Sequence, residues 1–285
     1  MGNKRRKRMV VDPNTGEVTE YIEFRDNDTL ITKEQKEFLE NKAKKYSDKT
    51  DFVWVKFVYN TDFYKLISPE NLTRLMYFAS FCGKENYVMQ DIDLKSVLHI
   101  NSNQVKTFKD EFFGQAIIQD GCRLYLCNEL FSKGKISKSP NNYARLYTET
   151  TRLLYLNCTS TSEHAYLSYF FRMIPFVNRQ SNILCTNQEE QDINHIAYMN
   201  VTEFFNLINR THHSRIKQKL LSYRINGELA IGFFNTIDRL DYRGKYALIN
   251  PILFYGGDKT KNSYKVIQKL FIDEKEERTS HDILH

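Results

Sequence analysis

This sequence of 285 residues lacks the signatures of several protein classes. Its apolar runs fall far short of the roughly 20 residues that a membrane-spanning helix needs, so we expect a soluble protein with no membrane partner. It contains no Gly-x-x-x-x-Gly-Lys loop, which argues against ATP hydrolysis. It also lacks the His-apolar-His pattern that would hold the metal of a rolling-circle nickase. We therefore expect a protein that is not an enzyme and that needs no cofactor and no metal ion.

Cysteine is scarce and shows no pairing pattern. The chain has five cysteines, an odd number, and no Cys-x-x-Cys spacing. Without a secretory hydrophobic segment, the simplest explanation is that the thiols are reduced in the cytoplasm. We therefore predict a cytoplasmic protein in which Cys122 and Cys127 are small core residues and not zinc ligands.

Aromatic and basic residues, in contrast, are plentiful. The 20 Phe and 18 Tyr, within a hydrophobic content of 41%, predict a folded core, because that much apolar surface can offset the entropy lost on ordering. The net charge is +6, and the basic residues are unevenly spread. They gather in four segments: Lys4 to Arg8, Lys133 to Lys138, Arg210 to Arg224 and Lys259 to Lys269. This clustering favours a polyanionic partner.

The first 50 residues are interpreted as a basic arm and not as a domain. Two short extended pieces flank a turn at Val11 to Val18, which contains Pro13 and Gly16. A charged helix is expected from Thr32 to about Tyr46, with few apolar positions to pack against anything else.

A repeating order of elements begins after this arm. In its first copy, a strand over Phe52 to Tyr59 precedes a helix that starts at Ser68-Pro69-Glu70. The next expected elements are a short helix from Asp93 to Leu98, a turn at His99 to Asn101, a helix from Ser102 to Gly114, and a hairpin from Ala116 to Cys127. Asp120-Gly121 within the hairpin predicts a type I′ turn.

The second half of the chain repeats this order. Asn200 and Glu203 form the pattern of a capping box before a short helix, and Asn209 to Arg224 is a basic helix with an apolar stripe. The other expected elements are a leading strand at Leu153 to Asn157, a helix from Ser162 to Pro175, strands at Glu228 to Phe234 and Lys245 to Ile249, and a helix from Asn262 to Arg278. Asn128 to Gly134 closes the first hairpin as Asn250 to Gly256 closes the second. The polar insertion Asn182 to Met199 is expected to be a loop or an extra strand.

Helix, turn, helix and hairpin in this order are typical of the winged helix-turn-helix, which lays its last helix in a major groove of DNA. The sequence thus predicts an α+β fold, mainly helical, with two tandem winged helix-turn-helix domains and short β wings. The expected parts are a basic N-terminal arm and helix at 1–50, a first winged-helix domain at 51–134, a linker at 135–143, a second winged-helix domain at 144–257, and a C-terminal helix and tail at 258–285.

Three stretches carry a family resemblance: the turn and helix Ile100 to Lys106, the wing ending Arg123 to Lys135, and its counterpart Lys245 to Phe254. In these stretches the chain resembles plasmid and phage replication proteins of low-GC Gram-positive hosts, and more generally tandem winged-helix initiators. The resemblance implies sequence-specific binding of double-stranded DNA, with initiation of replication at repeated origin sites. A second copy of the chain, forming a homodimer, and host replication proteins are further expected partners.

Two other functions stay open. A transcriptional repressor or regulator of a mobile element would show the same order of elements. His212-His213-Ser214-Arg215 also matches the His-x-x-Arg pattern of tyrosine recombinases, with Tyr242 as a conceivable nucleophile, although four-residue matches are common by chance.

Most candidate DNA-binding residues lie in the basic helix and the second wing. Arg210, His212, His213 and Arg215 are expected to reach base edges or flanking phosphates, and Lys217 and Lys219 to neutralise the DNA backbone. The wing candidates for minor-groove or phosphate contacts are Arg239, Arg243 and Lys245.

The corresponding helix of the first copy is less basic. Its candidates are Asn101, Asn103 and Gln104, whose side chains can pair with adenine edges, together with Lys106 and Lys109. Asp110 and Glu111 balance the two lysines, so this helix either reads DNA or forms a dimer or domain-packing surface.

Overall fold

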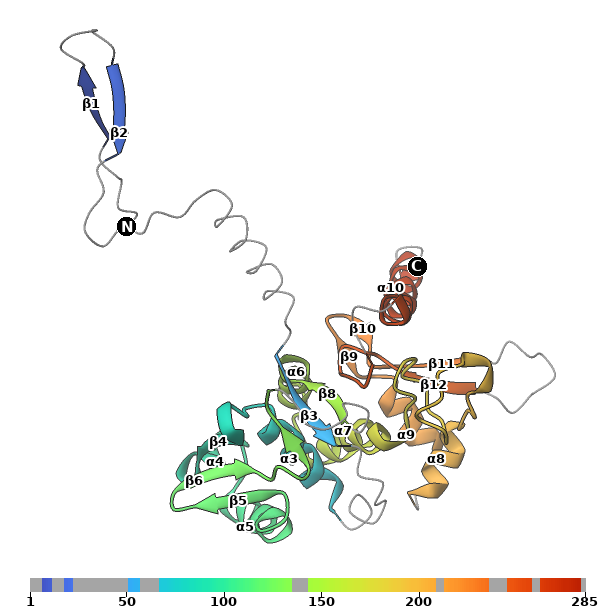
Figure 1. The fold of residues 1–285 in the computed structure, drawn as a ribbon. Helices are drawn as coiled ribbons and strands as arrows, with labels where there is room; N and C mark the ends of the chain where they lie inside the picture. The colour runs from blue at the N-terminus through green and yellow to red at the C-terminus, as the bar shows by residue number, and fades with distance from the viewer. Residues whose placement is uncertain are drawn as a thin grey trace. The chain divides into compact units, whose positions relative to one another are not determined.

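The computed structural model of this chain describes residues 7–11, 18–22, 51–56, 67–134, 143–208, 213–235, 245–257 and 262–282 (Figure 1). It is an α+β structure that combines helices with several small sheets. Internal contacts divide the chain into one unit from Met1–Lys49 and another from Thr50–His285.

In the first unit, β1 (Lys7–Val11) and β2 (Val18–Ile22) form an antiparallel hairpin, with Lys7 opposite Ile22 and Val11 opposite Val18. This pairing confirms the two extended pieces expected from the sequence. The turn between them and the helix expected from Thr32 lie outside the described residues.

The second unit is organised around an antiparallel sheet of four strands. Its order is β13 (Phe254–Tyr255), β8 (Tyr143–Tyr147), β3 (Phe52–Lys56) and β7 (Phe131–Ser132). The two central strands, β3 and β8, pair with Trp54 opposite Arg145. This sheet therefore takes two strands from before the expected linker and two from its end or beyond it, while residues 135–142 of that linker lie outside the described part of the chain.

Between β3 and β7, the elements follow the order expected from the sequence. They are α3 (Pro69–Ala79), the 3-10 turn η1 (Lys84–Asn86), β4 (Tyr87–Gln90), η2 (Asp91–Asp93), α4 (Leu94–Val97), α5 (Ser102–Phe112), β5 (Ile117–Asp120) and β6 (Arg123–Leu126). Pro69 at the first position of α3 and a complete capping box between Asn101 and Gln104 explain where α3 and α5 begin. The sequence did not predict β4, which joins the hairpin to give the sheet order β4-β6-β5.

The turn of this hairpin differs from the prediction. Asp120 pairs with Arg123, so the two turn residues are Gly121 and Cys122, and not Asp120 and Gly121. Gly121 has a positive φ of 57°, and Cys122 does not have a positive φ. A positive φ at the first turn residue alone is typical of a type II′ turn, because a type I′ turn needs it at both. The predicted type I′ turn is therefore wrong.

The second half has a similar order with additions. Its elements are α6 (Thr148–Leu156), α7 (Thr161–Met173), η4 (Ile174–Phe176), η5 (Ile193–His195), α8 (Val201–Leu207), α9 (His213–Leu220), β9 (Arg224–Ile225), β10 (Glu228–Leu229), β11 (Ile231–Asn235), β12 (Lys245–Ile249) and α10 (Asn262–Asp282). The capping box expected at Asn200 and Glu203 is confirmed, and so is the C-terminal helix. In the insertion, Ile183 forms a bridge to Leu248 of β12, which extends the β11–β12 pair.

Two expected elements of this half are wrong. Leu153 to Asn157 is not a strand, because Thr151, Leu154 and Tyr155 are buried at the i, i+3 and i+4 spacing of a helix and form part of α6. The leading strand is instead β8. The next helix, α7, is capped by Ser160 and not by Ser162, because the capping box needs Glu163 three residues after the cap.

Each half of the second unit contains a buried asparagine that makes the same kind of backbone contacts, which shows that the two halves are equivalent. Asn86 and Asn182 are both buried with positive φ, at 59° and 56°. The Asn86 amide donates to the carbonyls of Leu126 (3.4 Å) and Phe131 (3.0 Å). The Asn182 amide donates to those of Ile249 (3.1 Å) and Phe254 (2.9 Å). Each asparagine thus ties the last strand of its hairpin to an outer strand of the central sheet.

Backbone bonds fix the register of this repeat. Cys127 N donates to Ala116 O, and Asn250 N donates to Ala230 O, both at 2.9 Å. Cys127 is therefore the residue equivalent to Asn250. The sequence comparison had aligned Asn128 with Asn250, which is wrong by one residue. The strand register agrees, because Val55 pairs with Phe131 as Leu146 pairs with Phe254. The two halves are thus related by a local two-fold axis in the central sheet.

Candidate nucleic-acid interface

Helix α9 is amphipathic. Ile216 and Leu220 are buried, at 5% and 0% exposure, and hold the helix on the core. Successive residues of an α-helix are rotated by about 100°, which places Ser214, Arg215 and Gln218 on the opposite side. All three side chains are exposed. No Asp or Glu occurs between His213 and Leu220, so the outward face of α9 is cationic.

Two lysines lie on the flanks of that outward face. Lys217 is half-buried, with its Nζ 4.6 Å from the centre of the Phe233 ring, so its charged end lies over an aromatic ring of β11. Lys219 is exposed on the other flank. The arrangement gives α9 a polar central strip with one cation on each side.

The other candidates of this half fall into two groups. His213 is half-buried and packs against Phe205, with 5.4 Å between ring centres, so it supports the helix more than it extends outward. Lys245 is the first residue of β12, where its backbone pairs with Asn235. Arg210, His212, Arg239 and Arg243 lie outside the described residues.

In α5, two residues that were predicted to contact bases, Asn101 and Gln104, form the capping box at the start of the helix. Asn101 Oδ1 accepts from Gln104 N at 3.0 Å, and Gln104 Oε1 accepts from Asn101 N at 3.0 Å. These contacts occupy the acceptor atoms that pairing with an adenine edge would need. Asn103 and Lys106 remain exposed on the outer side of the helix.

Acidic neighbours reduce the charge of α5. Lys109 forms an ion pair with Asp91 at 2.7 Å, and its Nζ lies 5.3 Å from the centre of the Phe113 ring. Glu111 accepts a hydrogen bond from Ser68 at 2.6 Å, and Asp110 is exposed on the same outer face as Asn103, about two turns further along α5. The outward surface of α5 is therefore close to neutral.

The two helices can be compared position by position through their buried residues. Phe108 and Phe112 of α5 are buried with the same spacing as Ile216 and Leu220 of α9. Aligned on these pairs, the flank positions hold Lys109 and Glu111 in α5 and two lysines in α9. The central strip holds Asp110 in α5 where α9 has Gln218. Sequence reasoning missed Gln218, although its distance from the apolar stripe would have placed it on the outer face.

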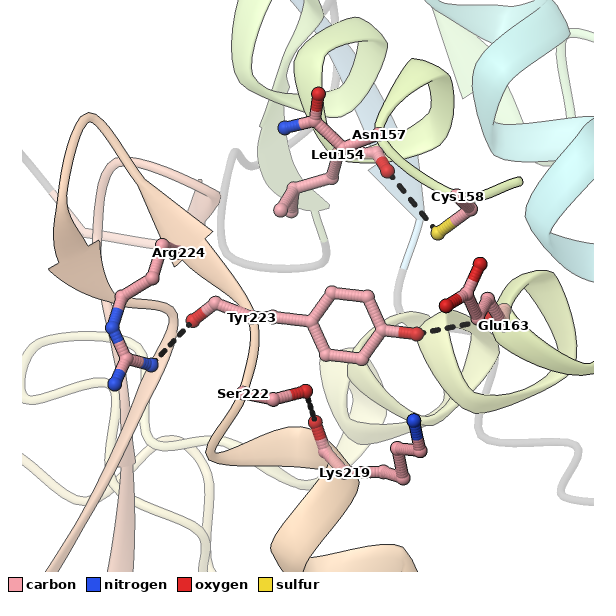
Figure 2. A pocket seen from close by; sticks show the side chains of 8 residues that line it. All are labelled: Leu154, Asn157, Cys158, Glu163, Lys219, Ser222, Tyr223 and Arg224. Atoms are coloured by element: carbon pink, nitrogen blue, oxygen red, sulfur yellow. Dashed lines mark hydrogen bonds between the residues drawn. The ribbon is translucent and has the colours of Figure 1, made fainter. Parts of the chain in front are cut away.

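The C-terminal end of α9 is anchored around a pocket of about 250 Å³ (Figure 2). The lining residues are Leu154, Asn157, Cys158, Glu163, Lys219, Ser222, Tyr223 and Arg224. Tyr223 follows the end of α9 and reaches α7, where its hydroxyl donates to Glu163 O at 2.7 Å. Burial raises the pKa of Cys158 to about 11, so the thiol stays protonated at neutral pH. Backbone hydrogen bonding from Thr159 lowers the pKa of Glu163.

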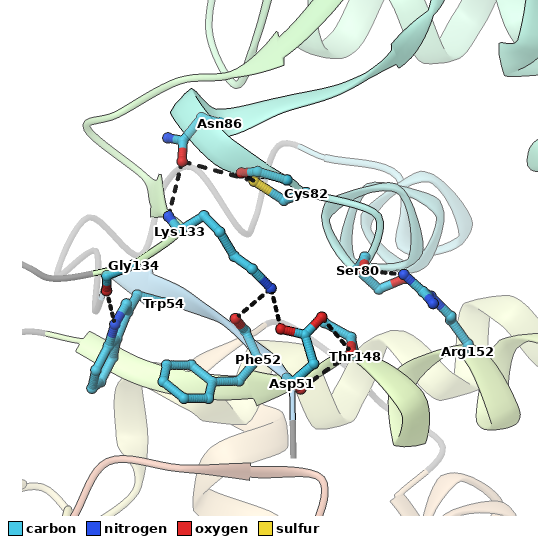
Figure 3. Close-up of polar contacts among 11 residues, drawn as sticks. Asp51, Phe52, Trp54, Ser80, Cys82, Asn86, Lys133, Gly134, Thr148 and Arg152 are labelled. Atoms are coloured by element: carbon cyan, nitrogen blue, oxygen red, sulfur yellow. Dashed lines mark hydrogen bonds and ion pairs between the residues drawn. The ribbon is translucent and has the colours of Figure 1, made fainter. Parts of the chain in front are cut away.

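Helix α6 connects the supports of both outward helices. At its start, Thr148 N donates to Asp51 O at 3.0 Å, and Lys133 forms an ion pair with the Asp51 carboxylate (Figure 3). Further along, Arg152 Nε donates to Ser80 Oγ at 3.1 Å, just after α3 ends. The Tyr155 hydroxyl donates to Leu98 O at 2.6 Å, in the turn before α5. Because Leu154 of α6 also lines the pocket beside α9, this helix contacts both halves.

Other site types find no support in the part of the chain that the structure describes. Within it, no group of three or more His, Cys, Asp or Glu residues could hold a metal ion. None of its helices has the length and apolar character needed to cross a membrane. No protein-family model, curated protein or solved structure was found to match this chain.

Proposed function

We propose that this protein binds double-stranded DNA in a sequence-specific manner, with α9 as the principal DNA-contacting helix. The observation that carries the proposal is the exposed side of α9, which bears Arg215 on its outward face and Lys217 and Lys219 on its flanks, with no acidic residue, while the other face is buried. Three cations on a short exposed helix repel one another, and a partner with regularly spaced negative charges relieves that repulsion. An eight-residue helix is about 12 Å long, a size that a DNA major groove admits.

The surrounding elements support a winged helix-turn-helix for each half. In the first half, the order α3, β4, α4, α5, β5 and β6, with the sheet order β4-β6-β5, places a hairpin directly after the last helix. In the second, α8 and α9 precede the β11–β12 pair, with the short β9–β10 pair between α9 and β11. In such modules, the last helix enters the major groove.

The biological role that we propose is initiation of phage or plasmid replication at repeated origin sites, without cleavage of the DNA. The support for this step is the resemblance of three stretches, which include the start of α5 and the strand β12, to replication initiators. A footprint of the purified protein on the DNA of its own locus tests it. Protection of a series of direct repeats is expected. Protection of a single promoter site would favour a repressor, and nicking of supercoiled DNA would favour a recombinase.

Salt dependence tests the α9 interface directly. Each phosphate contact adds about 0.9 to the slope of log affinity against log salt concentration. Lys217→Gln with Lys219→Gln should therefore lower the slope by about 2 and weaken binding. Lys265→Gln with Lys269→Gln is the matched control, because both residues are exposed on α10 and the net charge changes equally. Equal effects of the two pairs would remove α9 from the interface.

A further inference from the structure

The outward strip of α9 has a composition that specifies which bases it can read. Arg215 and Gln218 are exposed, and no hydrogen bond or ion pair engages either side chain within the described residues. They are three residues apart, which places them side by side on one helix face, separated by about 4.5 Å along its axis. That distance is close to the rise of one base pair, about 3.4 Å per strand.

The two side chains have different hydrogen-bonding patterns. Arginine presents a fork of N–H donors that matches O6 and N7 of guanine. Glutamine combines one acceptor with donors and so matches N6 and N7 of adenine. Ser214, beside them, can donate to or accept from either base and adds little discrimination.

From this arrangement we propose that Arg215 and Gln218 are the specificity-determining residues of the protein, and that they read a guanine and an adenine at neighbouring base pairs. The inference rests on the proposed DNA-binding function and adds the base content of its target. Residues three apart on a recognition helix contact successive bases in other DNA-binding modules, which fits the spacing seen in α9.

The lysines on the flanks have a separate task. Lys219 is exposed on one side of the central strip, and the Lys217 ammonium lies over the Phe233 ring on the other side. Under the proposed function both would contact the DNA backbone and not the base edges. The equivalent helix α5 lacks both base-reading side chains, since its central strip carries Thr107 and Asp110 at the positions of Arg215 and Gln218. We therefore assign base discrimination to the second half of the chain.

The test is selection of bound duplexes from a random pool by the full-length protein, followed by titration of single-base variants of the selected site. The wild type should select guanine next to adenine, and replacement of that adenine should weaken binding about 5- to 150-fold. Gln218→Ala should abolish the preference at the adenine position and keep the guanine. Gln218→Glu should change the preferred base to cytosine, because a carboxylate accepts from cytosine N4.

Lys219→Ala is the control for affinity without specificity. It should weaken binding to all duplexes equally and leave the selected sequence unchanged. DNA binding with the same base preference in wild type, Gln218→Ala and Gln218→Glu would overturn the inference. Absence of DNA binding by the wild type would instead overturn the proposed function, so the two failures are distinguishable.

Discussion

The buried side chain of Asn182 provides a quantitative test of the packing that holds the second hairpin in place. Its amide is the donor for two carbonyls, those of Ile249 and Phe254, and the residue has 0% exposure. In Asn182→Ala both carbonyls lose this donor in a site that water does not reach. Each loss costs about 1 to 3 kcal/mol.

The backbone adds a second term to this cost. Asn182 has a φ of 56°, in the left-handed region, where alanine is disfavoured by about 1 to 2 kcal/mol. One contribution acts in the other direction, because Oδ1 of Asn182 is buried without a hydrogen-bond partner among the described residues. Removing that atom relieves a desolvation penalty of about 1 kcal/mol. Together these terms predict that Asn182→Ala lowers the free energy of unfolding by about 2 to 7 kcal/mol.

Urea denaturation followed by the fluorescence of Trp54 is a suitable assay, because Trp54 is the single tryptophan and lies in the central sheet. Asn182→Gly is the matched variant, since it loses the same donors but tolerates the left-handed backbone. It should be about 1 kcal/mol less destabilising than Asn182→Ala. If both variants unfold within about 1 kcal/mol of the wild type, the assigned role of the amide is wrong.

Three further outcomes are expected. Burial lowers the pKa of His164 below its ordinary 6.5, so the unfolded chain takes up a proton at this residue more readily than the folded chain. Stability therefore falls as the pH drops below that value, and His164→Gln should reduce this fall in urea titrations across pH. Tyr155→Phe leaves Leu98 O without its donor and should cost about 1 to 3 kcal/mol in urea denaturation, with Tyr223→Phe, which loses a similar bond to Glu163 O, as a comparison. Asn103→Ala with Lys106→Ala should weaken DNA binding less than the lysine pair of α9; a change in mass by light scattering, without loss of DNA affinity, would assign α5 to assembly.

Local signals in the sequence were sufficient for most helices. The capping box at Asn200 and Glu203, and Pro69 at the start of α3, involve residues within one turn of each other, so the pattern is complete in a short window. Where the three-residue spacing of the capping box was not applied, the structure differs from the prediction. Ser160 and not Ser162 has the required spacing to Glu163, and Asn101 has the same spacing to Gln104.

The central sheet could not be predicted in the same way. The pairing of β3 with β8 joins residues from opposite halves of the chain, and no short pattern in either strand specifies its partner. β4 was missed for a related reason, because four residues give little periodicity and its stability depends on β6.

The candidate site was predictable in position and less so in detail. The stripe of Ile216 and Leu220 fixes which face of α9 is exposed, and this follows from the sequence alone. A search guided by positive charge, however, selects lysines and passes over Gln218, the uncharged residue in the middle of the same face. The pairing of Lys109 with Asp91 was also invisible, because Asp91 belongs to a different element.

The outward faces of α5 and α9 differ in charge, and this difference matters because α6 supports both helices. Tyr155 fixes the turn before α5, and Leu154 lies beside the pocket at the end of α9, so the two helices are held on one support. Under the proposed function, DNA binding by α9 would hold α5 at a high effective concentration near the same duplex. Under the same proposal, a near-neutral α5 would lie close to the duplex without binding DNA strongly by itself, while base discrimination stays with α9. The same neutrality would leave it suited to contact another protein, so the low charge of α5 is compatible with a division of tasks between the halves.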